Sequence, residues 1–166
     1  RFAPVPFAGR GDLTAVFGAG PNDVRLAEIV PDDGAGTSAL WRGGARGFQR
    51  ESVRAPGIVY ALWGSGADQI FAVGESACLR WNGKRWQTLV GCENKTLFGV
   101  WGSARDRVFA VGRQGVDAVV MRWDGQAFRL LASPTEGSVL RGVWGRGGGE
   151  LLLTSENGSL IFQRVN

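Results

Sequence analysis

The sequence predicts an all-β protein in which one antiparallel four-stranded unit is used four times. A 12-residue phrase returns without a gap at 17–28, 63–74, 101–112 and 144–155, opening on Phe17 or on a tryptophan. The phrases start 46, 38 and 43 residues apart, which is the spacing of four-stranded propeller blades. Glycine, at 27 of the 166 residues, recurs at turn positions. We therefore expect a single domain over 1–166, a β-propeller of four blades at about 13–53, 57–90, 96–131 and 138–164 plus 1–5.

The second repeat shows the strand order that we expect within a blade. Apolar and β-branched residues predict strands at 59–64, 69–74, 77–81 and 85–90. The dipeptide Asn82-Gly83 between the last two is a strong hairpin signal. The third repeat copies this order at 97–102, 107–112, 118–123 and 128–131, and the first follows it at 13–18, 24–30, 38–42 and 48–53.

The fourth repeat lacks its last strand, because strands are expected only at 140–145, 150–154 and 160–164. Residues 1–5 align with 85–89 and supply the missing strand, with Pro4 suited to an outer edge. A strand from the N-terminus would close the ring within one chain. The same complementarity permits an alternative, in which two chains exchange these strands and each forms half of an eight-bladed ring.

Composition limits the classes of partner. The net charge of +4 is scattered, so no nucleic-acid surface is expected. No stretch of 18 apolar residues occurs, and we expect a soluble domain without membrane insertion. Because the chain opens on Arg1 and not on Met, we expect it to be processed or excised from a longer protein.

The two cysteines, Cys78 and Cys92, lie in the same repeat. The predicted strands bring them to one edge of the second blade, which favours a disulfide over two buried thiols. A disulfide would indicate an oxidising compartment, and we expect an extracellular, cell-surface or periplasmic location. With no histidine in the chain, no metal site and no cofactor are expected.

The candidate binding residues break the repeat. One position in each predicted inner strand varies in chemistry from blade to blade, as Thr14, Tyr60, Phe98 and Arg141. Residues that vary on a repeated scaffold are the ones expected to determine which ligand binds. Trp41 is a further candidate binding residue, because it also breaks the repeat. The aromatic residues that open each phrase are expected to pack between adjacent blades instead.

The groups that could suggest catalysis or metal binding are expected to have structural roles in turns and loops. The aspartates Asp23, Asp68 and Asp106 recur at one turn of successive blades, so they are expected to accept turn hydrogen bonds and not to converge on a substrate. The segment 31–34 with Thr37 lacks the oxygen ligands of a calcium site. The run 147–149 is a flexible turn and not a phosphate loop.

The third repeat also carries a resemblance to a known family. Its Val100-Trp101-Gly102, Asp106, the stretch 108–112 and the stretch 122–125 resemble the tandem repeats of bacterial β-propeller proteins, common among myxobacterial secreted or surface proteins. The resemblance implies a binding or scaffolding role outside the cytoplasm, and larger rings are the norm in that family. Arg25 departs from the pattern, since Phe71, Phe109 and Leu152 hold the equivalent positions.

The sequence therefore favours a non-catalytic module that recognises a protein or a carbohydrate through one face of the propeller. A self-assembling unit that forms a homodimer is one alternative. A glycan hydrolase or lyase using Asp32, Asp33 or Glu136 is another, less favoured because the carboxylates are scattered.

Overall fold

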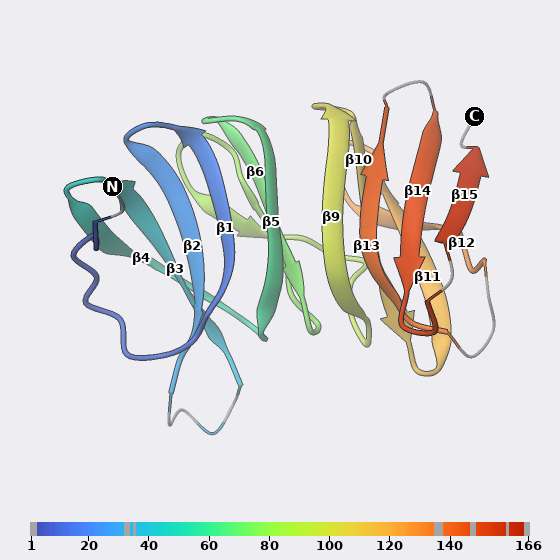
Figure 1. Cartoon of the computed structure of the whole chain (residues 1–166), viewed down its shortest axis with the longest axis horizontal. Helices are drawn as coiled ribbons and strands as arrows, with labels where there is room; N and C mark the ends of the chain where they lie inside the picture. The colour runs from blue at the N-terminus through green and yellow to red at the C-terminus, as the bar shows by residue number, and fades with distance from the viewer. Residues whose placement is uncertain are drawn as a thin grey trace.

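The computed structural model describes residues 3–31, 34, 36–134, 138–146, 149–158 and 160–164. Over these residues the protein is all-β, as predicted, with four antiparallel sheets that follow one another in chain order (Figure 1). Among the described residues, no helix has the length and hydropathy needed to cross a membrane.

The first two sheets each hold four strands in meander order. Sheet 1 comprises β1 (Leu13–Gly20), β2 (Asp23–Ile29), β3 (Ser38–Gly44) and β4 (Gly47–Ala55). Sheet 2 comprises β5 (Val59–Gly66), β6 (Gln69–Gly74), β7 (Cys78–Trp81) and β8 (Trp86–Thr88).

Sheet 3 repeats this order and sheet 4 has three strands in the described part of the chain. Sheet 3 comprises β9 (Thr96–Ala104), β10 (Arg107–Gln114), β11 (Asp117–Trp123) and β12 (Phe128–Ala132). Sheet 4 comprises β13 (Leu140–Gly145), β14 (Glu150–Ser155) and β15 (Leu160–Arg164). Each repeated phrase forms the end of a first strand and most of a second.

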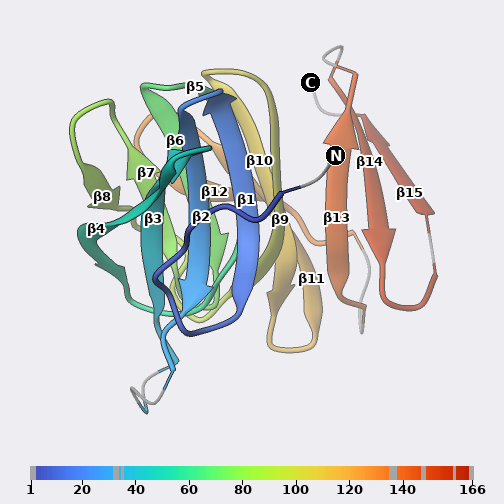
Figure 2. The same cartoon turned by 60° about the vertical axis from the view of Figure 1, so that its left-hand side comes forward.

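The first strands of the sheets lie side by side in the order β1, β5, β9, β13 (Figure 1). Figure 2 shows β13, β14 and β15 as one sheet at the end of the series. Apolar side chains fill the space between neighbouring sheets. One cluster joins sheets 1 and 2, another joins sheets 2 and 3, and a third joins sheets 3 and 4. Burial of this apolar area is the main stabilising contribution to the fold.

Closure of the ring by the N-terminal strand is not what the structure shows. In the described part of the chain, residues 3–10 form no strand, and Phe7 packs on Trp41 and Phe48 of sheet 1. The segment before β1 and strand β15 lie at opposite ends of the molecule in Figure 1. Arg1 and Phe2, which the predicted strand also includes, lie outside the described residues.

A buried carboxylate explains the path of this segment. Glu28 of β2 accepts hydrogen bonds from the backbone nitrogens of Arg10 and Gly11, both at 2.6 Å, through Oε1. Its Oε2 accepts the indole N–H of Trp41 at 2.7 Å. Glu28 is only 4% exposed, and charge-assisted hydrogen bonds to a buried carboxylate are strong. These bonds hold the segment before β1 against sheet 1.

Candidate functional site

The four residues predicted as a binding row lie at one position of successive first strands. Thr14, Tyr60, Phe98 and Arg141 lie near the beginnings of β1, β5, β9 and β13. Because these strands are neighbours, the four residues follow one another across the molecule.

Three of the four are in direct contact. The ring centroids of Tyr60 and Phe98 are 5.3 Å apart with planes inclined at 34°, an aromatic pair between sheets 2 and 3. The guanidinium carbon of Arg141, from sheet 4, lies 4.0 Å from the centroid of the Phe98 ring. This is a cation–π distance. We call these three residues the aromatic row.

The aromatic row is partly open to solvent. Tyr60 and Phe98 are half-buried, and the Arg141 side chain is 47% exposed. Arg141 also forms an ion pair with Glu156, which follows β14. The row therefore presents two aromatic rings and one cation whose partner is itself exposed.

Partial burial is the main influence on the pKa of the Tyr60 phenol. Burial raises the pKa of Tyr60 above its ordinary value, and the negative charge of Glu75 raises that pKa further. Arg113 and Arg141 lower the same pKa by smaller amounts. The hydroxyl is thus a hydrogen-bond donor at physiological pH.

Thr14 forms a hydrogen bond to the neighbouring sheet. Its Oγ1 donates a hydrogen bond of 2.6 Å to the carbonyl of Val59 at the beginning of β5. This bond joins sheet 1 to sheet 2 at the level of the aromatic row. Whether Thr14 also contacts a ligand stays a prediction.

Trp41 lies apart from the row, in β3. It is 7% exposed, its ring is 4.8 Å from that of Phe7, and its indole N–H is bonded to Glu28. Trp41 also lines an open pocket of about 390 Å³, together with Glu28 and Arg50. A role for Trp41 in recognition stays a prediction.

The repeated aspartates are dispersed over different sheets. Asp23 pairs with Arg25 and Arg42 within sheet 1, and Asp68 pairs with Arg105 across the turns of sheets 2 and 3. The Arg105 hydrogen bond is the main reason that the pKa of Asp68 is lowered.

The other residues considered for catalysis, Asp32, Asp33 and Glu136, lie outside the described residues.

The predicted disulfide is confirmed. Cys78, the first residue of β7, is bonded to Cys92, which lies beyond β8, with the Cα atoms 6.0 Å apart. Both residues are buried in the cluster between sheets 2 and 3. The bond fastens the outer strand of sheet 2 to the strand beside it.

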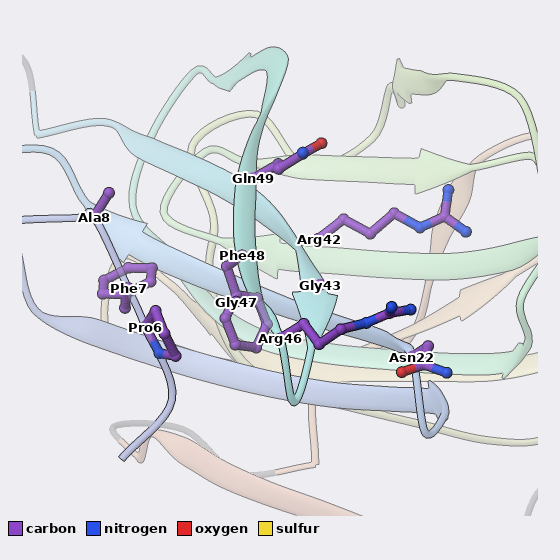
Figure 3. A pocket seen from close by; sticks show the side chains of 10 residues that line it. All are labelled: Pro6, Phe7, Ala8, Asn22, Arg42, Gly43, Arg46, Gly47, Phe48 and Gln49. Atoms are coloured by element: carbon purple, nitrogen blue, oxygen red, sulfur yellow. The ribbon is translucent and has the colours of Figure 1, made fainter.

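An open pocket of about 760 Å³ lies between the segment before β1 and the hairpin of β3 and β4. The sequence did not indicate this pocket. In Figure 3 the rings of Phe7 and Phe48 lie side by side there, while Arg42 and Arg46 extend from the hairpin of β3 and β4. The pocket depends on the fold of the segment before β1. The repeat alignment of residues 1–5 predicts an outer strand for that segment and does not reveal its path along sheet 1.

Comparisons with known proteins bear on the fold alone. No family model matches the chain, and no curated protein matches it. Among solved structures, it is similar to the crystal structure of the computationally designed Ika4 protein, with a TM-score of 0.70 and 13% sequence identity. The match covers 99% of this chain and 100% of the Ika4 chain. The arrangement of four sheets over the whole chain therefore has a counterpart in an experimental structure.

Proposed function

We propose that this chain is a non-catalytic recognition module of the β-propeller class, with the aromatic row as its binding surface. The observation that carries the proposal is the contact of Tyr60, Phe98 and Arg141 across three sheets. These residues differ in chemistry at one position of a repeated scaffold, and they are partly exposed. A repeated scaffold needs no such variation for its own packing.

The chemistry of the row favours a carbohydrate over a protein. Aromatic faces stack on the apolar face of a sugar ring, and a guanidinium forks to a carboxylate. The phenol of Tyr60 supplies a hydrogen-bond donor beside them. An oligosaccharide that contains uronic acid meets all three groups, with its carboxylate replacing that of Glu156 at Arg141.

Two further properties belong to the same proposal. The order of the sheets and the adjacency of their first strands support propeller blades, with the four sheets as part of a ring. The disulfide supports an oxidising compartment, such as the cell surface or the periplasm.

An oligosaccharide array that contains neutral and uronic acid chains tests the proposed ligand. The wild type is expected to bind uronic acid chains, and Tyr60→Ala with Arg141→Ala is expected to weaken that binding about tenfold or more. The matched control is Arg129→Ala with Leu130→Ala, which removes an exposed cation and an exposed apolar side chain from β12. Unchanged binding by a folded Tyr60 and Arg141 double variant, or no oligosaccharide binding by the wild type, would overturn the assignment.

A further inference from the structure

One contact is repeated at each boundary between neighbouring sheets. An aromatic residue at the opening of each phrase packs against a glycine of the next first strand. A Cβ atom added to Gly64 would lie 2.7 Å from Phe17, and one added to Gly102 would lie 2.6 Å from Trp63. A Cβ atom added to Gly145 would lie 2.7 Å from Trp101. Only glycine leaves room for these rings.

In the two end sheets, over the described residues, this contact is incomplete: sheet 4 has an aromatic residue that packs on no glycine, and sheet 1 has a glycine that no aromatic residue covers. Trp144 of β13, the fourth aromatic residue of the set, is 52% exposed. Gly18 of β1, the fourth glycine, has no atom within 4 Å of the position of an added Cβ. A fourth contact of the same kind would pair Trp144 with Gly18, so it would join the two end sheets.

Apolar side chains next to this contact behave in the same way. Leu62, Val100 and Val143 hold one position in β5, β9 and β13, and each packs in the cluster that joins its sheet to the preceding one. Val16 holds that position in β1 and is 66% exposed. Sheet 1 thus exposes an apolar side chain at the position where the other sheets pack against a preceding sheet.

The segment before β1 occupies the place of an outer strand of that preceding sheet. Alignment of Arg1 with Arg85 puts Phe7 at the position of Gly91. A Cβ atom on Gly91 would meet the backbone of Phe128 in β12, and Phe7 lies 6.2 Å from Phe48, which holds the equivalent position in β4. The segment before β1 therefore lies on sheet 1 where the outer strand of a preceding sheet would lie, although residues 3–10 form no strand there.

Sheet 4 is the sheet that fits this place. Over the described residues it has three strands, and β15 has no neighbour on its outer side. Within one chain, sheets 2 and 3 stand between it and sheet 1 (Figure 1). A second copy of the chain has no such restriction.

We propose that the partner of both end faces is a second copy of this chain. Trp144 of each copy packs over Gly18 and Val16 of the other, and the N-terminal segment of each copy extends the partner's sheet 4 beside β15. A two-fold axis makes the two junctions identical and closes a ring of eight sheets. The ring leaves neither end face nor the β15 edge exposed.

The assembly is independent of the ligand proposed for the aromatic row, but it extends the surface. Thr14 of the partner would follow Arg141 of the first copy, as Tyr60 follows Thr14 within the chain. Each row would then continue into the other around the ring. Failure of ligand binding and failure of assembly are separate results.

Sedimentation velocity of the full chain over a wide range of concentration tests the proposal. The decisive variant is Gly18→Gln, because its side chain meets open space in a single copy but occupies the place of the incoming indole. We expect the dimer of the wild type to weaken at least about tenfold. The matched control is Gly20→Gln in the same strand, since Gly20 is equally open and its counterpart Gly66 meets only Asp68 of its own sheet.

A second pair of variants tests the other half of the contact. Trp144→Ser is expected to give single chains with an unchanged melting curve at low concentration, whereas Leu130→Ser, which removes a side chain 55% exposed on β12, is expected to stay dimeric. The proposal is overturned if the wild type sediments as single chains. It is also overturned if Gly18→Gln and Trp144→Ser remain as dimeric as their controls.

Discussion

Arg25 shows how one residue adapts a repeated interface. It stands where the other repeats have Phe71, Phe109 or Leu152, and it is 1% exposed. Its guanidinium bonds Asp23 at 3.0 Å and Glu51 at 2.8 Å, and its Cζ lies 4.5 Å from the centroid of the Trp81 ring. The cation fills the space of an apolar side chain while two carboxylates balance its charge.

Loss of Arg25 is expected to be costly. Arg25→Ala leaves the poorly solvated carboxylate of Glu51 without its cation and leaves Asp23 with Arg42 alone, which lowers the free energy of unfolding by about 3 kcal/mol. Urea unfolding followed by tryptophan fluorescence measures the change. Arg105→Ala is the control, because its pair with Asp68 is exposed and should leave the midpoint nearly unchanged. Equal midpoints for the two variants would contradict a stabilising role for the buried cation.

Asp124 is expected to make stability depend on acidity. Hydrogen bonds from the backbone of Ala127, from Arg129 and from the backbone of Gln126 lower its pKa from 3.8 to about 2. A carboxylate with a lowered pKa stabilises the fold above its unfolded pKa, and that contribution disappears as the pH falls from about 4 to 2. Asp124→Asn keeps the turn acceptor but removes the titration. The difference in urea midpoint between wild type and variant should shrink over this interval, and a constant difference would refute the assignment.

At the scale of elements, the repeat predicted the strands well because each phrase combines period-2 apolar residues with turn residues at fixed offsets. The hairpin at Asn82-Gly83 was less predictable. Trp81 pairs with Trp86, and the side chain of Asn82 accepts bonds from the backbone of Lys84 and Arg85, so the turn spans 82–85. Local side-chain bonding selected a longer turn than the dipeptide suggested.

The N-terminal segment was predicted to be a strand, and its actual path depends on contacts that are distant in sequence. Glu28, Trp41 and Phe48 hold it against sheet 1. A carboxylate in a strand pattern does not reveal which backbone nitrogens it will meet. Of the candidate site, sequence variation identified the aromatic row, but the contacts within the row required the packing of neighbouring sheets.

The disulfide acts on the short outer strand β8, because it links a residue that follows β8 to the first residue of β7. Replacement of both cysteines by Ser should remove about 3 kcal/mol, the chain-entropy value for a loop of this length. The melting temperature should fall while the far-ultraviolet circular dichroism spectrum of the folded state is retained. An unchanged melting temperature would contradict a stabilising bond.

At the scale of the whole molecule, four similar sheets leave two dissimilar ends. The curvature of the series depends on the angle at which adjacent sheets pack, which no single repeat encodes. The sequence therefore predicted sheets and their order, but left closure within one chain and closure between two chains as alternatives. The exposed Trp144 and the open Gly18 favour closure between chains.

The most direct test of this account is the mass of the unmodified chain in solution, measured by light scattering after size exclusion at increasing concentration. A closed two-fold assembly has a mass of twice the 17.7 kDa chain, and this mass stays constant once the dimer has formed. A mass that remains at one chain would contradict the account. A mass that keeps rising beyond two chains would contradict it as well, because it would show open head-to-tail association without closure.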